Sequence, residues 1–211
     1  MQSASTRPRR IPCQVRGERR VAELLEAAEA VIAQAGYEAA TMSAIADRAG
    51  ASIGSLYQFF PSKPAITQAL RIYYAKQFNR MCEPLAEQAK SLTVEDLVDR
   101  LIKLTIEFIE GHPAFPALLD APRSAGPSAA IRNQLREQLA GIFRARKPRL
   151  TKTEAIRLAT VTLHIMKALN HLYTELAPSQ RRVFIQEFKI VLLSYLSARF
   201  EPRAATPRSV R

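Results

Sequence analysis

The chain has 211 residues, of which 47% are hydrophobic and 24% are charged, with a formal net charge of +12. This composition indicates a globular protein of one or two domains rather than a disordered chain. Two cysteines exclude a disulfide framework, and no apolar run is long enough to cross a membrane. The first twenty residues hold six Arg and no apolar segment, unlike a secretory signal. We therefore expect a cytoplasmic protein without a membrane partner.

The positive charge lies mainly at the two ends. Residues 1–20 carry six Arg and one Glu, and residues 151–211 carry ten basic and four acidic side chains, whereas residues 21–64 carry two basic and five acidic ones. We expect residues 1–18 to form a basic flexible arm and residues 201–211 a disordered tail. A basic chain attracts nucleic acid or an anionic membrane, and charge alone does not distinguish the two.

The first helices follow from apolar spacing and from capping residues. Apolar residues recur at i, i+3, i+4 and i+7 from Val21 to Ala35, and Gly36 is suited to end that helix. The next boundaries are Thr41 and Ser52 as N-caps of two short helices, Gly50 as the turn between them, and Ser62 as the start of a long helix to about Ala89.

Helical periodicity continues to the end of the chain, without an alternating pattern typical of strands. The expected later helices are one over Leu97–Phe108, a short one at about 117–120, and long ones at about 128–146, 153–176 and 179–200. The sequence therefore predicts an all-α protein of about nine helices, with a three-helix N-terminal bundle and a larger C-terminal one. The predicted domains are residues 19–64 and residues 65–200.

Two short helices joined at Gly50 match a helix-turn-helix, in which the second helix enters the major groove of DNA. Over residues 19–75 the chain resembles the TetR family of bacterial transcriptional regulators. The motif lies in Gly36-Tyr37, Thr41, Ile45-Ala46, Ala49-Gly50, Leu56-Tyr57 and Phe60-Pro61-Ser62-Lys63. The resemblance implies a homodimer that binds a double-stranded DNA operator and responds to a small molecule.

The candidate DNA contacts lie on the polar faces and N-termini of these two helices. Hydroxyls at a helix N-terminus suit phosphate oxygens, Gln favours adenine edges, and a glycine lets the backbone approach DNA closely. The resemblance makes Tyr57 and Lys63 phosphate contacts, and the arginines of the arm can support them, although the arm could equally serve solubility. The candidates are Thr41, Ser43, Arg48, Ser52, Ile53, Gly54, Ser55, Tyr57, Gln58 and Lys63.

The C-terminal half is predicted by family analogy to hold an effector pocket and a dimer interface formed by the last two long helices. Pocket candidates, each of which could instead be core, are Phe108, His112, Phe115, Leu119, Met166, Asn170 and Tyr173. Interface candidates are Leu158, Val161, Ile165 and Leu169 in one helix, and Phe184, Phe188, Val191, Leu192 and Tyr195 in the other.

We predict a repressor that leaves a palindromic operator when the effector binds. A nonspecific architectural DNA-binding protein is the alternative suggested by the charge, and a helical enzyme is a third. Against an enzyme, the sequence lacks the glycine-rich and nucleophile motifs of common catalytic folds. The three histidines, His112, His164 and His171, lack metal-ligand spacing. We therefore expect no catalytic residue, no metal and no cofactor.

Overall fold

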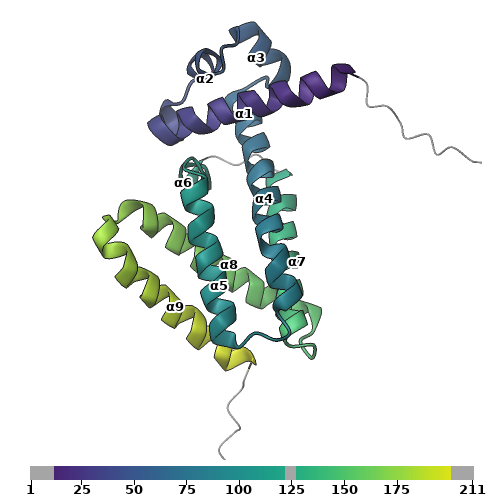
Figure 1. Ribbon diagram of the computed structural model, residues 1–211, viewed down its shortest axis with the longest axis vertical. Helices are drawn as coiled ribbons and strands as arrows, with labels where there is room; N and C mark the ends of the chain where they lie inside the picture. The colour runs from purple at the N-terminus through teal and green to yellow at the C-terminus, as the bar shows by residue number, and fades with distance from the viewer. Residues whose placement is uncertain (1–11, 122–126, 201–211) are drawn as a thin grey trace, which may run out of the picture.

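The computed structural model describes residues 12–121 and 127–200, and every element within these ranges is an α-helix (Figure 1). The predicted all-α class is confirmed. The helices are α1 (Pro12–Ala39), α2 (Met42–Arg48), α3 (Ile53–Phe59), α4 (Lys63–Gln88), α5 (Val94–Gly111), α6 (Phe115–Asp120), α7 (Pro127–Arg146), α8 (Lys152–Glu175) and α9 (Pro178–Phe200).

Capping residues set the boundaries of the N-terminal bundle as the sequence predicts. The side-chain oxygens of Thr41, Ser52 and Ser62 each accept a hydrogen bond from the backbone N–H three residues later, at 3.1, 3.2 and 3.3 Å. Gly36 has φ 78° and Gly50 has φ 57°, a left-handed conformation that residues with a Cβ rarely adopt. The main run of α1 therefore ends at Gly36, and the chain reverses between α2 and α3 at Gly50.

Helix α1 begins at Pro12 rather than at Val21. Residues 12–18 of the predicted flexible arm are therefore helical, and residues 1–11 lie outside the described residues, as does the predicted tail 201–211. Proline is favoured in the first turn of a helix, and Arg19 pairs with Glu23 four residues later at 3.1 Å. Residues 16–20 of this extension are Arg, Gly, Glu, Arg and Arg, so they offer no apolar periodicity to detect.

Helix α4 connects the two bundles (Figure 1). Its first turns contribute Ile66, Leu70 and Tyr74 to a core shared with α1, α2 and α3, so α4 crosses the predicted domain boundary between residues 64 and 65. Phe108 at the end of α5 and Leu118 in α6 belong to the same core. The N-terminal bundle is thus packed directly on one end of the C-terminal bundle.

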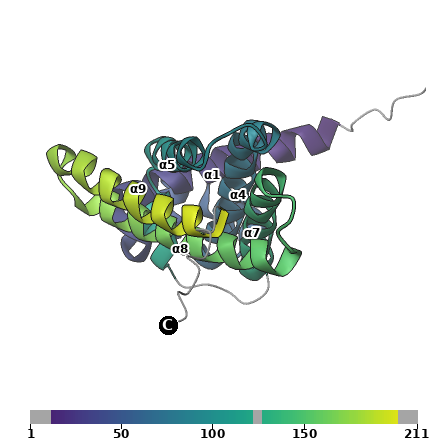
Figure 2. The same cartoon turned by 90° about the horizontal axis from the view of Figure 1, so that it is seen from below.

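The C-terminal bundle has its own core, drawn from α4, α5, α7, α8 and α9. Figure 2 shows α8 and α9 side by side along one flank of the molecule. Three predicted interface residues, Leu158, Leu169 and Leu192, are buried in this core because they face the subunit's own helices. None of the described helices is long and apolar enough to span a bilayer.

Candidate nucleic-acid interface and internal cavity

The helix pair α2–α3 has one buried and one exposed face. Ile45, Ala46 and Leu56 anchor the pair in the N-terminal core, each at most 1% exposed. Because these residues fix the inner faces, the opposite faces of both helices are directed away from the protein. Figure 1 shows α2 and α3 at the end of the molecule farthest from α9. A partner can therefore reach both helices at once.

The outer face of α3 combines apolar and polar groups. Ile53 is 41% exposed and Tyr57 is 49% exposed, one helical turn apart. Ser52, Gly54 and Gln58 are also exposed, whereas Ser55 is half-buried. Large apolar side chains are rarely left this accessible on so short a helix without a partner. The arrangement suits the floor of a DNA major groove, which offers hydrogen-bonding edges and thymine methyl groups.

Gly54 has no structural reason to be glycine within the described residues. Its backbone is helical, and a Cβ added to it would meet no other described atom within 4 Å. Glycine in a helix interior costs about 1 kcal/mol relative to alanine. The missing side chain leaves open space on the outer face of α3, next to the exposed Ile53, although the helical Gly141 of α7 has equally open surroundings.

Thr41, the N-cap of α2, is exposed, as are Ser43 and Arg48 within α2. Lys63 is engaged differently from the simple phosphate contact that the sequence suggested. Its Nζ donates hydrogen bonds to the carbonyl oxygens of Tyr37 and Glu38, both at 2.9 Å, and lies 4.5 Å from the centre of the Tyr37 ring. Lys63 therefore holds the C-terminal end of α1 against the start of α4.

The two arginines that directly follow the predicted arm have internal partners. Arg20 donates to Glu23 at 2.9 Å and contacts the carbonyl oxygen of Ala49 at 3.5 Å, which ties α1 to the turn before α3. Hydrogen bonds from Arg20 and then Arg19 lower the pKa of Glu23 below its ordinary value. Part of the positive charge of residues 1–20 is therefore balanced within the protein.

The C-terminal bundle contains a partly open cavity of about 310 Å³ between α4, α5, α6, α7 and α8. This volume lies at the lower end of the range of small-molecule sites, roughly 300–1,000 Å³. Its lining consists of Arg71, Tyr74, Ala75, Phe78, Thr105, Phe108, Phe115, Leu118, Leu119, Arg132, Leu135, Arg136, Thr160, Leu163, His164, Met166, Lys167 and Asn170. Ten of these eighteen side chains are apolar or aromatic, and eight are polar or charged.

Five of the predicted pocket residues line this cavity: Phe108, Phe115, Leu119, Met166 and Asn170. His112 and Tyr173 do not, and both are corrections to the sequence-based set. His112 Nδ1 lies 3.3 Å from Glu29 Oε1, which draws the imidazole toward α1. The Tyr173 hydroxyl donates to Glu110 at 2.5 Å, and Arg181 lies over its ring, so Tyr173 links α8 to α5 and α9 instead.

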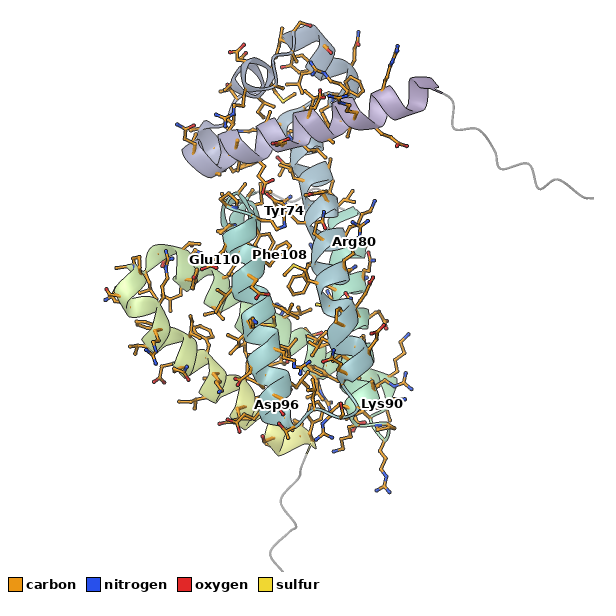
Figure 3. The ribbon with its side chains drawn as sticks, in the orientation of Figure 1. Tyr74, Arg80, Lys90, Asp96, Phe108 and Glu110 are labelled. Atoms are coloured by element: carbon orange, nitrogen blue, oxygen red, sulfur yellow. The ribbon has the colours of Figure 1, made fainter. Side chains whose placement is uncertain are left out.

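Glu29, Tyr74 and His112 form a polar cluster between the two bundles. The buried hydroxyl of Tyr74 donates to Glu29 Oε1 at 2.8 Å, and burial followed by this hydrogen bond raises the pKa of Tyr74 above its ordinary value. The His112 ring lies 4.8 Å from that of Tyr74 and 4.5 Å from that of Phe108. Figure 3 shows Tyr74 and Phe108 facing each other from α4 and α5. Two side chains of the cavity wall thus connect to α1.

Family models match both bundles. The model described as "Bacterial regulatory proteins, tetR family" matches residues 24–70, and that described as "Tetracyclin repressor-like, C-terminal domain" matches residues 93–196. Together they cover most of the chain. The chain belongs to the TetR family. The first TetR match includes α2 and α3 entirely, and the second begins at the N-cap of α5.

Solved structures of the TetR family share this fold. A TetR-family transcriptional regulator from Streptomyces coelicolor is 22% identical, covering 86% of this chain and 99% of its own, with a TM-score of 0.67. FadR from Bacillus subtilis, solved in complex with stearoyl-CoA, is 17% identical, covering 83% and 96%, with a TM-score of 0.61. At these identities the likeness establishes the fold.

Among curated TetR-type proteins, the repressor KstR from Mycobacterium tuberculosis is 50% identical over 40 residues, which cover 19% of this chain and 18% of KstR. KstR from Rhodococcus jostii is 41% identical over 58 residues, covering 28% and 26%. The matched segments thus span about a fifth to a quarter of these curated relatives. High identity is confined to a short part of the chain.

Several cavity residues escaped the sequence prediction. Tyr74 and Phe78 lie in α4, which we had not included in the wall, and they fall between the two segments that the TetR models match. Arg132, Arg136 and Lys167 were missed because charged residues in an amphipathic helix normally face water. A usable signal was present for Lys167, which is flanked by the predicted pocket residues Met166 and Asn170.

Proposed function

We propose that this TetR-family protein is a sequence-specific, DNA-binding transcriptional repressor that a small molecule in the internal cavity releases from its operator. The observation that carries the proposal is the outer face of α3, where Ile53, Tyr57 and Gln58 are exposed beside a glycine that packs against nothing in the described structure. The KstR relatives are named as transcriptional repressors, which favours repression over activation.

In this proposal α3 lies in the major groove. Ser52, Ser55 and Gln58 contact base edges, Ile53 packs on a thymine methyl group, and Tyr57 contacts a phosphate. Thr41, Ser43 and Arg48 bind phosphates from the neighbouring helix α2. An ammonium group has three N–H donors, so the two carbonyl bonds of Lys63 leave a third for a phosphate oxygen.

Dimerisation through α8 and α9 would place two copies of α3 on successive major grooves. Apolar side chains remain exposed on this flank: Val161 of α8 at 36%, and Val183, Phe184, Ile190 and Val191 of α9 at 37–63%. A two-fold dimer buries the same patch on both subunits, and its recognition helices then read a near-palindromic site. The dimer would act on DNA in the cytoplasm.

The structural change that releases DNA would pass from the cavity to α1. A ligand between Tyr74 and Phe108 would press on the two aromatic rings that contact His112, and the Tyr74 hydroxyl holds Glu29 of α1. A ligand shifts the equilibrium only if it binds the released conformation more tightly. The structure of FadR in complex with stearoyl-CoA supports a small-molecule ligand for this fold, because that neighbour holds a ligand with a long apolar chain.

The experiment is selection from a randomised pool of DNA duplexes by the full-length chain, followed by affinity measurements on the selected duplex. We expect a near-palindromic motif whose half-sites are about one helical turn, or a multiple of it, apart. Gln58→Ala should weaken binding about tenfold or more, since one good base contact contributes about 1–3 kcal/mol.

Gln134→Ala is the matched control, because Gln134 is an exposed glutamine on α7 and far from α3 in sequence and in the fold. This variant should bind the selected duplex like the wild type. Selection of no motif, or equal losses for Gln58→Ala and Gln134→Ala, would refute the proposal.

A further inference from the structure

The cavity has an aromatic side. Tyr74 and Phe78 of α4 meet Phe108 of α5 and Phe115 of α6, with ring centres 4.9 Å apart for Phe108–Phe115 and 5.3 Å apart for Phe78–Phe108, both edge-to-face. Leu118 and Leu119 extend this wall along α6. A ligand part placed here meets apolar and aromatic carbon almost exclusively, so it must itself be apolar.

The other side of the cavity carries basic side chains. The exposed Arg132 and the half-buried Arg136 lie one turn apart on α7, and the half-buried Lys167 lies on α8, which packs against α7. Among the described residues that line the cavity, four are Lys or Arg and none is Asp or Glu. The fourth cation, Arg71, donates to the carbonyl oxygens of Leu118 and Ala121 and has a clear structural role.

One polar atom of the cavity wall lacks a partner. Asn170 is 7% exposed, lines the cavity, and its Oδ1 has no hydrogen-bond partner among the described residues. Burying a polar group without a hydrogen bond is unfavourable. Because Asn170 follows Met166 and Lys167 by three to four residues, it lies on the same face of α8 as the basic side chains of the cavity. Its Oδ1 accepts hydrogen bonds, so only a ligand group with an N–H or O–H donor would satisfy it.

We infer that the cavity binds an anionic amphiphile. The apolar part lies against Tyr74, Phe78 and Phe108, and the anionic head binds the guanidinium groups of Arg132 and Arg136, which match a carboxylate or a phosphate geometrically. The volume of about 310 Å³ is roughly twice that of an apolar cavity known to bind benzene, about 150 Å³, so a chain of several carbons fits.

The regulatory role of such a ligand rests on the proposed function. Ligand binding itself can be measured without DNA. The test is calorimetric titration of the full-length chain at pH 7.5 with decanoate, decan-1-ol and decylammonium, each below its micelle concentration. The three probes share an apolar tail and differ in head-group charge. Decanoate, fully ionised at this pH, should bind at least about tenfold more tightly than the other two.

Two variants separate charge from packing. Arg132→Gln combined with Arg136→Gln should weaken decanoate binding by about tenfold or more and leave decan-1-ol binding unchanged, because only the charge-assisted hydrogen bonds are removed. Arg144→Gln is the matched control, since Arg144 is exposed on the same helix and does not line the cavity. Its affinities should equal those of the wild type. Far-UV circular dichroism verifies that all variants remain folded.

Three results would overturn the inference: equal affinity for decanoate and decan-1-ol, tighter binding of decylammonium, or an unchanged decanoate affinity in the folded double variant. Each is independent of whether the chain selects a DNA motif. If the chain prefers decanoate but selects no DNA motif, the proposed regulatory function is contradicted and the anionic ligand class is supported. If it selects a DNA motif but shows no preference for decanoate, the regulatory function is supported and the anionic ligand class is contradicted.

Discussion

The hydrogen bond between Tyr74 and Glu29 joins the two bundles, and Tyr74→Phe removes it while keeping the ring. Tyr74 is 2% exposed, and its hydroxyl donates to Glu29 Oε1 at 2.8 Å. A hydrogen bond to a charged group contributes about 1.5–3 kcal/mol. In the variant the Glu29 side chain keeps its 20% exposure and its contact with His112, so water and the imidazole partly replace the lost hydrogen bond to its carboxylate. We therefore expect a loss near the lower limit, about 1.5 kcal/mol.

For a chain of this size each kcal/mol shifts Tm by roughly 2–4 °C, so Tm should fall by about 3–6 °C. Urea and thermal unfolding followed by circular dichroism measure both quantities. Tyr73→Phe is the control, because the neighbouring Tyr73 is 40% exposed and a surface change of this kind alters stability by less than about 0.5 kcal/mol. Equal stability of Tyr74→Phe and wild type, or equal losses for both variants, would refute this account of the junction.

The same bond gives a pH dependence with a defined sign. Burial, and then the hydrogen bond to Glu29, raise the pKa of Tyr74 above the value near 10 that a tyrosine has in the unfolded chain. Above about pH 10 the unfolded chain loses this proton while the folded chain keeps it, so the stabilisation is lost as pH rises. Tyr74→Phe should therefore make stability fall less steeply between about pH 9 and 11.

Three further predictions concern other parts of the molecule. Gly54→Ala should raise the free energy of unfolding by about 1 kcal/mol, since its helical site has room for a Cβ, and should weaken DNA binding, whereas Gly50→Ala, at φ 57°, should lower the free energy of unfolding by about 1 kcal/mol. Urea unfolding measures the stabilities, and fluorescence anisotropy measures the DNA affinity. An unchanged DNA affinity in Gly54→Ala would contradict a close approach of DNA to the α3 backbone. Cys82 is 4% exposed, and burial raises its pKa to about 12, so in a Cys13→Ser chain, which keeps Cys82 as its one thiol, a thiol reagent at pH 8 should react only after unfolding; rapid labelling of this variant in its native state would contradict the prediction. Val183→Glu combined with Ile190→Glu should shift dimer to monomer in sedimentation velocity, and an unchanged dimer would place the interface elsewhere.

Local signals predicted the fold well. Thr41 and Ser52 cap their helices as their side chains favour, and Gly36 and Gly50 have the positive φ that their positions suggested. Capping and turn chemistry depend on a few neighbouring residues, which the sequence displays directly. The extension of α1 to Pro12 was missed because residues 16–20 hold no apolar side chain, so periodicity gave no signal there.

The cavity was harder to predict because it depends on which helices meet. Apolar spacing in α8 marks Leu169 and Met166 alike, and both are buried in the same core, yet only Met166 also lines the cavity. Lys63 and His112 illustrate the same limit, since each is positioned by a partner distant in sequence: the carbonyl oxygens of Tyr37 and Glu38, and the carboxylate of Glu29. Such pairings follow from tertiary packing and not from spacing along one helix.

The central claim is that α3 reads a specific DNA sequence, and the most direct measurement is the ratio of two dissociation constants. Fluorescence anisotropy at physiological salt would compare the selected duplex with a scrambled duplex of equal length and composition. A sequence-specific regulator should bind the selected duplex at least about a thousandfold more tightly. A ratio near one would identify a nonspecific, charge-driven DNA-binding protein and would contradict the account.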